Sequence, residues 1–247
     1  MTSEIQTQTQ EAPTGDKKAK RVREYGSDPQ GVERPSVTTL LERHYGRAPF
    51  NPDIDAVRRG TEIGTITHAR IAEVLTGVKH DVGEVLFPDS FQIAQACFNS
   101  FLRWFSVADV TPYVGEDGKP DEGVIYVEHK MIDEVRNIGG TLDLLAWVDG
   151  HLMLLDFKTS TAVSEIAWVQ LAGYADLLHA TTGARVVPHR HVVVHLQKDG
   201  SDPIIHDGSA FRLDALKVWH GCITQHEMRR QFLKTSKQAV KTKGAMQ

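Results

Sequence analysis

Two aspartates and one lysine between residues 140 and 160 have the types and the spacing of a divalent-metal site. Asp149 and Gly150 favour a type I′ turn, because both central residues of that turn need a positive φ. Around such a turn, strand pairing brings Asp143 opposite Asp156, and Lys158 points to the same sheet face as Asp156. Carboxylates opposed in this way repel each other unless a cation lies between them or one is protonated. The hairpin therefore predicts a metal site with a positioned lysine.

A plainer interpretation of these residues is structural. An Asp-x-Lys triplet occurs by chance in many proteins, and an Asp can end a strand as a turn or cap residue. Asp143 falls in the middle of its predicted strand, however, where Asp is disfavoured. Its position there favours a functional role for the pair.

Length and composition indicate a chain that can bury a sizeable core. The 247 residues are 40% hydrophobic, and the formal net charge of −4 gives no global basic field for nucleic acid. The two cysteines, Cys97 and Cys222, lie far apart, which argues against a zinc ribbon, an iron–sulfur cluster or a disulfide scaffold and suits a reducing compartment. The sequence has no membrane-length apolar run and begins without a secretory signal.

The chain divides into a tail, one domain and a second tail. Residues 1–33 lack apolar periodicity and are predicted to be disordered, with a basic run at 17–23. Residues 34–235 are predicted to form the ordered domain, and a polar tail covers 236–247. Basic residues outnumber acidic ones from Lys217 onward, which would suit contact with a phosphate backbone or simply a solvated helix end.

The apolar patterns predict helices and strands in an order typical of a mixed α/β domain with a small central sheet flanked by helices. Ser36 is predicted to cap a first short helix, and Ser164 and Gly183 to bound a later one. The other predicted elements are a helix in the second half of 53–77, a helix over 91–109, a loop over 115–123, a strand over 124–133, the 140–158 hairpin, a strand over 191–196 and a helix over about 210–234.

Polar residues on neighbouring helices are candidates to extend the site. Gln170 and Tyr174 are four residues apart, so they share a helix face that could lie beside the aspartates; alternatively Tyr174 is a core aromatic and Gln170 a solvent residue. His68 could complete a carboxylate site for Mn²⁺ or Mg²⁺. Glu73 and Glu128 could support the ligands from outside, with Glu128 the better candidate.

Three histidines offer a competing metal site. His189, His191 and His195 alternate along a predicted strand and would resemble a zinc patch. Arg190 among them and the absence of a cysteine nearby weaken this interpretation.

The motifs GTITH, GTLD, DFK and QLAGY, in this order, resemble those of RecB-type nucleases of the PD-(D/E)XK superfamily, which include CRISPR-associated and phage exonucleases. Each motif is weak alone, but their order and their predicted secondary structure are specific together. The family's helix histidine matches His68, its motif-two acid Asp143, and its Asp-x-Lys Asp156 and Lys158. Its Gln-x-x-x-Tyr matches Gln170 and Tyr174.

Two departures from the family pattern refine this resemblance. Many relatives carry cysteines for an iron–sulfur cluster, which this chain lacks, so the resemblance points to cluster-free phage-type exonucleases. An acid commonly follows the helix histidine by four residues, whereas here Ala72 holds that position and Glu73 comes one later. The departure puts a role for Glu73 in doubt.

The resemblance implies a restriction-endonuclease-like core and metal-dependent hydrolysis of DNA, by an exonuclease of phage or bacterial recombination or repair. It implies that His68, Asp143, Asp156 and the Phe157 carbonyl hold Mg²⁺ or Mn²⁺ without an iron–sulfur cluster, and that Lys158 serves the attacking water. Gln170 and Tyr174 would then bind DNA. The implied partners are single-stranded DNA or duplex ends and a single-strand annealing protein, in a bacterial or phage-infected cytoplasm.

Two other functions compete with an exonuclease. One is a non-catalytic DNA-end-binding or annealing partner that retains the nuclease fold, although such a module would not need paired carboxylates beside phosphate. The other is cleavage of RNA, or site-specific endonuclease action.

Overall fold

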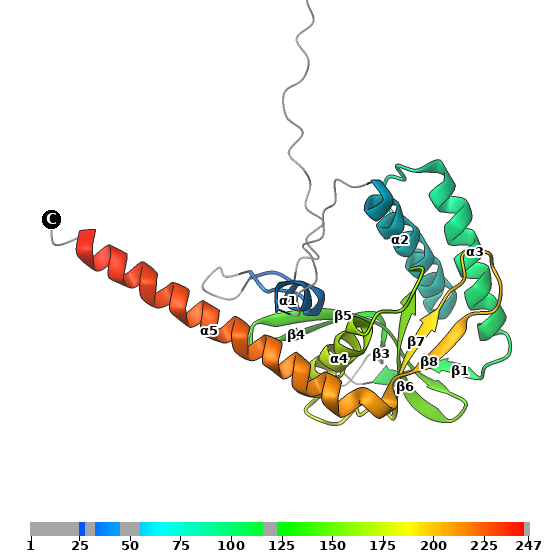
Figure 1. Ribbon diagram of the computed structural model, residues 1–247. Coiled ribbons are helices and arrows are strands. Elements are labelled where there is room, and N and C mark those ends of the chain that lie inside the picture. The colour runs from blue at the N-terminus through cyan, green and yellow to red at the C-terminus, as the bar shows by residue number, and fades with distance from the viewer. Residues whose placement is uncertain (1–24, 28–32, 45–54, 116–122, 245–247) are drawn as a thin grey trace, which may run out of the picture.

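The computed structural model describes residues 25–27, 33–44, 55–115 and 123–244. They form an α/β fold in which helices flank a curled, six-stranded mixed sheet (Figure 1). The predicted fold class is confirmed at this level. The predicted domain boundaries at residues 34 and 235 stay predictions.

The sheet is built around the long strand β5. It runs in the order β1-β5-β6-β7-β8, with β4 also paired to β5, and only β6 and β7 are parallel to each other. The strands are β1 (Val110–Pro112), β4 (Val127–Asp133), β5 (Ile138–Val148), β6 (His151–Lys158), β7 (Arg190–His195) and β8 (Ile204–Asp207). A separate two-stranded sheet pairs β2 (Val114–Gly115) with β3 (Val124–Ile125).

The β5–β6 hairpin has the predicted turn and register. Asp149 and Gly150 have φ values of 48° and 76°, as a type I′ turn requires. Val148 pairs with His151, and the pairing continues outward to Leu144 and Leu155. The sequence therefore predicts the hairpin pairing correctly from the turn outward to Leu144, and the next residue outward is Asp143.

Helices cover both faces of the sheet (Figure 1). They are α1 (Val37–His44), α2 (Asp55–Thr76), α3 (Pro88–Phe105), α4 (Ile166–Thr182) and α5 (Arg212–Gly244), with a short 3₁₀ turn at Ser209–Phe211. Ser36 caps α1 as predicted, because its hydroxyl accepts a hydrogen bond from the Thr39 amide at 3.1 Å. The predicted cap at Ser164 is wrong: Glu165 precedes α4, and no side chain caps that end.

Two hydrophobic clusters fill the two sides of the sheet. The first packs α1, α4 and α5 on residues that include Leu142, Leu145 and Leu154. The second packs α2 and α3 on residues that include Leu144 and Phe157. Because Leu142 and Leu145 share a cluster while Leu144 lies in the other, the alternation of β5 shifts by one residue at Asp143. This irregularity in the strand is where the candidate site forms.

Several element boundaries differ from the predictions. The short strands β1 and β8 were not predicted, and the strand expected over 124–133 is interrupted at Tyr126. Helix α5 continues ten residues beyond the predicted end at 234, and its red end in Figure 1 projects away from the sheet. Residues 116–122 of the predicted loop lie outside the described residues, as do most of residues 1–33.

Tyr25 is an ordered residue within the segment that the sequence predicts to be disordered. Its ring is buried against Gly139 on β5, and its hydroxyl lies 2.9 Å from the Thr141 hydroxyl. Arg34 donates a hydrogen bond to the Tyr25 carbonyl at 3.1 Å. An isolated aromatic residue in a polar segment gave no periodic pattern from which this contact could be predicted.

Candidate metal centre

Asp143 lies where the β5–β6 ladder ends. The expected direct pairing of Asp143 with Asp156 is not formed, because the regular pairing stops at Leu144 and Leu155. Instead, the Asp143 carboxylate accepts a hydrogen bond from the Phe157 amide at 2.8 Å. The side chain thus takes the place of a strand partner, and the two acids meet at an irregular strand end rather than across a regular ladder.

Glu128 approaches Asp143 from the other side, on β4. It lies between Val127 and His129, which pair with Leu144 and Leu142 on β5. Its φ is 46°, a left-handed conformation that non-glycine residues seldom adopt within a strand. Such strain is concentrated at functional sites, where the surrounding structure holds it in place. The distortion of β4 coincides with the shift in β5, and together they place both carboxylates at one point.

His68 reaches the same point from α2. Its Nδ1 lies 2.9 Å from Glu128 Oε1 and 3.6 Å from Asp143 Oδ1, and its Nε2 lies 3.0 Å from the Phe157 carbonyl oxygen. Both ring nitrogens therefore face oxygen acceptors. The helix supplies this imidazole because Ile63, Ile66 and Ile71 fix the adjoining face of α2 in the second hydrophobic cluster.

These three side chains form a group that could hold a metal ion. One ligand atom from each of His68, Glu128 and Asp143 lies within 4.8 Å of the others. Carboxylate oxygens suit Mg²⁺ and Mn²⁺, and imidazole nitrogen is a common ligand of transition metals, so this donor set could hold a divalent ion.

Asp156 supplies a further reason to expect a cation. Its side chain is 1% exposed, yet neither carboxylate oxygen has a hydrogen-bond partner. The Lys158 ammonium lies 2.7 Å from Oδ2 and forms an ion pair with it, but the geometry of this pair does not meet the criteria of a hydrogen bond. A buried carboxylate with unpaired oxygens is costly unless something else binds it. A metal ion beside Asp143 would meet this need.

Charge within the centre perturbs two of its groups. Burial acts to lower the pKa of His68, but Asp143, Glu128 and Asp156 outweigh it and raise that pKa to about 9. Burial is the main cause that raises the pKa of Asp143 to about 7; Asp156 and Glu128 add to it, and His68 and Lys158 oppose it. Without a metal, a proton on His68 supplies the positive charge that the carboxylates require.

A chain of hydrogen bonds leads from Lys158 into α4. The Lys158 ammonium donates to Gln170 Oε1 at 3.1 Å, and the Gln170 amide donates to the Tyr174 hydroxyl at 2.9 Å. Gln170 and Tyr174 therefore do face the site, as their spacing predicts. Tyr174 is buried in the first hydrophobic cluster, so its accessible contribution is confined to this chain of polar atoms.

The other candidates do not join the centre. Glu73 is exposed on α2. His191 is buried, and His195 instead bonds the Ser160 carbonyl at 2.7 Å and lies beside His206. Within the described part of the chain, the one group of three potential ligands is His68, Glu128 and Asp143. Cys97 and Cys222 are free and lie in different hydrophobic clusters.

Sequence reasoning undervalued Glu128. The sequence predicts only a supporting role for this acid, whereas in the structure Glu128 makes the shortest contact to His68. Its strand position relative to Asp143 could have been found by pairing the 124–133 strand with the hairpin. Nothing in a glutamate predicts a positive φ, so the turn of its side chain toward His68 could not have been predicted in that way.

Comparison with known proteins leaves the site to be judged on its own geometry. A scan against protein-family models gave no match, and a search of curated proteins found no similar sequence.

Among the described residues, no helix combines the length and the apolar character that a membrane crossing needs.

Proposed function

We propose that this protein is a metal-dependent deoxyribonuclease with a restriction-endonuclease-like core. The observation that carries the proposal is the convergence of His68, Glu128 and Asp143 beside Asp156, a buried carboxylate whose oxygens have no hydrogen-bond partner. A lysine is paired to that same carboxylate. Three acids, an imidazole and an ammonium at a strand end form a set that suits phosphodiester hydrolysis.

Mg²⁺ or Mn²⁺ would be held by Asp143, Asp156 and His68, with the Phe157 carbonyl and Glu128 as further oxygen donors. Such an ion supplies an acidified water and offsets the charge that develops on the phosphate. Because the Phe157 amide bonds Asp143 while its carbonyl faces His68, one peptide unit orients two of these residues. The main chain of β6 thus sets the relative positions of the proposed ligands.

Lys158 is proposed to serve the reacting groups directly. Asp156 and Gln170 hold its ammonium from two sides, and its side chain remains 27% exposed. An ammonium fixed in this way can orient a water and contact the phosphate, and it could take a proton from that water only after losing one of its own. Gln170 and Tyr174 position this amine, and the exposed edge of Gln170 would contact the DNA strand.

The resemblance of the motifs to RecB-type nucleases supports DNA as the substrate and exonuclease action at single-stranded or duplex ends. It also supports a single-strand annealing protein as a partner in recombination or repair. The matched residues that place polar groups at or beside the candidate centre are His68, Asp143, Asp156, Lys158 and Gln170. Tyr174 is buried, and its hydroxyl contacts Gln170.

The deciding experiment is digestion of end-labelled linear DNA and of circular DNA of the same sequence. We expect cleavage with Mg²⁺ or Mn²⁺ that EDTA stops, loss of linear DNA before circular DNA, and no cleavage by Asp143→Asn. That variant keeps an oxygen for the Phe157 amide, so its fold is preserved. Asp202→Asn is the matched control, because the Asp202 side chain is 84% exposed.

Three results would count against parts of this proposal. Full activity in EDTA would remove the metal centre from the mechanism. Equal loss of circular and linear DNA would replace exonuclease with endonuclease action. Tight binding to DNA ends without cleavage in Mg²⁺, Mn²⁺ or Ca²⁺ would make the protein a non-catalytic end-binding partner.

A further inference from the structure

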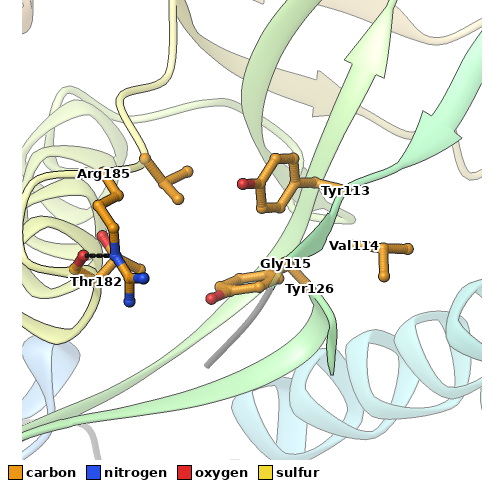
Figure 2. Close-up of a pocket in the computed structure, with 7 residues that line it drawn as sticks. Tyr113, Val114, Gly115, Tyr126, Thr182 and Arg185 are labelled. Atoms are coloured by element: carbon orange, nitrogen blue, oxygen red, sulfur yellow. Dashed lines mark hydrogen bonds between the residues drawn. The ribbon is translucent and has the colours of Figure 1, made fainter. Parts of the chain in front are cut away.

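A polar hollow lies away from the metal centre, between the β2–β3 hairpin and the C-terminal end of α4. It has a volume of about 300 Å³ and is lined by Tyr113, Val114, Gly115, Tyr126, Thr182, Arg185 and Val186. This volume is at the low end of small-molecule sites, which span about 300–1,000 Å³. Figure 2 shows the two tyrosine rings and the Arg185 side chain across the hollow from each other.

Arg185 is anchored in a way that leaves most of its donors available. Its Nε donates to the Thr182 carbonyl at 2.8 Å, the dashed line in Figure 2. Among the described residues, no acidic side chain forms an ion pair with it. A guanidinium has five N–H donors, and the fork of its terminal nitrogens matches the oxygens of a phosphate. Arg185 is an exposed residue that lines the hollow, so it places there a positive group of the kind that binds phosphate.

The opposite wall is aromatic and is held by the main chain. The Tyr126 amide donates to the Tyr113 carbonyl at 3.0 Å, and the Tyr113 amide donates to Leu145 on β5 at 2.8 Å. The two rings meet edge to face with centroids 5.4 Å apart. Tyr126 is buried, whereas Tyr113 is half-buried and offers ring surface to the hollow.

Gly115 gives this wall its shape. A Cβ at that position would lie 2.7 Å from Cε1 of Tyr113 and 3.1 Å from Cε2 of Tyr126. Any side chain there would push the Tyr113 ring out of place. The residue thus allows the ring to lie close against the strand that carries it.

We propose that this pocket binds one nucleotide, with its base against Tyr113 and its phosphate on Arg185. Base–aromatic stacking and a phosphate-binding arginine are the two contacts by which proteins hold single nucleic-acid strands without reading sequence. The pocket holds both, at a spacing set by α4 and the β2–β3 hairpin.

The same elements connect the pocket to the metal centre. Tyr126 lies two residues before Glu128, and Thr182 lies eight residues after Tyr174 on α4. Gln170, which holds Lys158, lies twelve residues before Thr182, a rise along α4 of about 18 Å that about five stacked nucleotides cover at about 3.4 Å each. With DNA as the source of the nucleotide, a step that rests on the proposed function, the pocket would hold a strand a few nucleotides from the scissile bond.

The test measures binding in EDTA, so that cleavage and the metal centre do not contribute. Calorimetry with dAMP, adenosine and inorganic phosphate, and fluorescence anisotropy with labelled dT₈, separate a free nucleotide from a strand. We expect Arg185→Gln and Tyr113→Leu each to weaken dAMP and dT₈ binding about tenfold. Arg185→Gln should also reduce the salt dependence of dT₈ binding by about one unit of log–log slope.

Matched variants separate local loss from damage to the fold. Tyr113→Phe keeps the ring and should bind dAMP within about twofold of the wild type, since stacking needs only the π-face. Lys79→Gln removes an exposed charge three residues after the end of α2 and should leave both affinities unchanged. Equal thermal stability of Arg185→Gln and wild type establishes that the pocket variant is folded.

Each other result would overturn the nucleotide pocket. Wild-type affinity of Arg185→Gln for dAMP and dT₈ would mean that Arg185 does not bind the phosphate. Binding of inorganic phosphate as tightly as dAMP would mean that the pocket is an anion site and does not recognise a nucleotide. Tyr113→Leu with wild-type affinity would remove the base contact. Because all these affinities are measured in EDTA without cleavage, loss of the pocket and failure of the proposed nuclease are distinguished.

Discussion

The metal centre and a second, largely buried group of charges, Asp133, Arg136 and Asp176, differ in how their carboxylate oxygens are bonded. Asp133 accepts hydrogen bonds from the Val135 and Arg136 amides and from the Arg136 guanidinium. The same guanidinium reaches Asp176, which also accepts from the Trp219 indole at 2.8 Å.

In this second group each acid has fixed donors. Although burial acts to raise the pKa of Asp133, the amide and guanidinium of Arg136 hold that pKa below its ordinary value. In the metal centre, Asp156 lacks hydrogen bonds and the pKa of Asp143 is raised to about 7, chiefly by burial. The difference separates a group whose acids all have fixed donors from one that could hold a metal ion.

The largest expected effect is on activity at Asp156. Asp156→Asn should slow cleavage by at least about 10³-fold, which corresponds to about 4 kcal/mol in activation free energy. The free energy of unfolding in EDTA should be unchanged or higher, because a buried carboxylate without hydrogen bonds is replaced by a neutral amide. Single-turnover digestion and urea denaturation measure the two quantities. Marked destabilisation with retained cleavage would place Asp156 in the structural class of Asp133.

Lys158 should behave as a positioned amine rather than a bulk charge. Lys158→Ala should lower the cleavage rate by about 10²–10⁴-fold, the usual contribution of a general acid or base, while calorimetric Mn²⁺ affinity changes little. Lys158→Arg should not restore the rate, because the planar guanidinium has a different reach and does not lose its proton. Wild-type cleavage by the arginine variant would leave Lys158 as a charge only.

Arg136 provides the converse test. Arg136→Met should lower the free energy of unfolding by about 3 kcal/mol, because it leaves Asp133 and Asp176 buried without their shared cation. Urea denaturation measures the loss, and cleavage by the remaining folded protein should be near the wild-type rate at low temperature. A loss of activity without a loss of stability would contradict the distinction between the two groups.

The two groups should also respond to pH with opposite sign in metal-free protein. Asp143 has a folded pKa raised to about 7, so its contribution to stability is lost as pH rises from about 4 to 7. Asp133 has a lowered folded pKa, so its contribution is present above about pH 4 and lost as pH falls further. Asp143→Asn should therefore gain stability relative to wild type between about pH 4 and 7, as measured by urea denaturation in EDTA. Parallel stability curves for the two proteins would contradict the raised pKa of Asp143.

Local sequence patterns predicted the part of this site between Asp143 and Tyr174, because those residues lie close together in the chain. Turn chemistry at Asp149 and Gly150 fixed the hairpin register, and a four-residue helical spacing placed Gln170 and Tyr174 on the face toward Lys158. These inferences use interactions over fewer than about 20 residues, where the periods of strand and helix determine geometry.

Irregular backbone and long-range contacts were beyond such patterns. The break in the ladder at Asp143, the left-handed Glu128 and the packing of Tyr25 on Gly139 each depend on segments that meet only in the folded chain. The sequence therefore singled out Asp143 and Asp156, but it predicted neither the central place of Glu128 nor that Asp143 would bond the Phe157 amide instead of opposing Asp156.

The smallest expected effect concerns the hydrogen bonds behind Lys158, and it tests how far the metal centre extends into α4. Tyr174→Phe removes only the hydroxyl that Gln170 contacts and keeps the buried ring, so it should lower the rate a few-fold. Combined with Gln170→Ala, which also frees the Lys158 ammonium, the loss should reach about tenfold and DNA binding should weaken, with Mn²⁺ affinity nearly unchanged. Thr181→Val, on the same helix but bonded only to helix carbonyls, is the control. If the double variant cuts and binds DNA as wild type does, Gln170 and Tyr174 belong with the structural contacts of α4, and the functional group ends at Lys158.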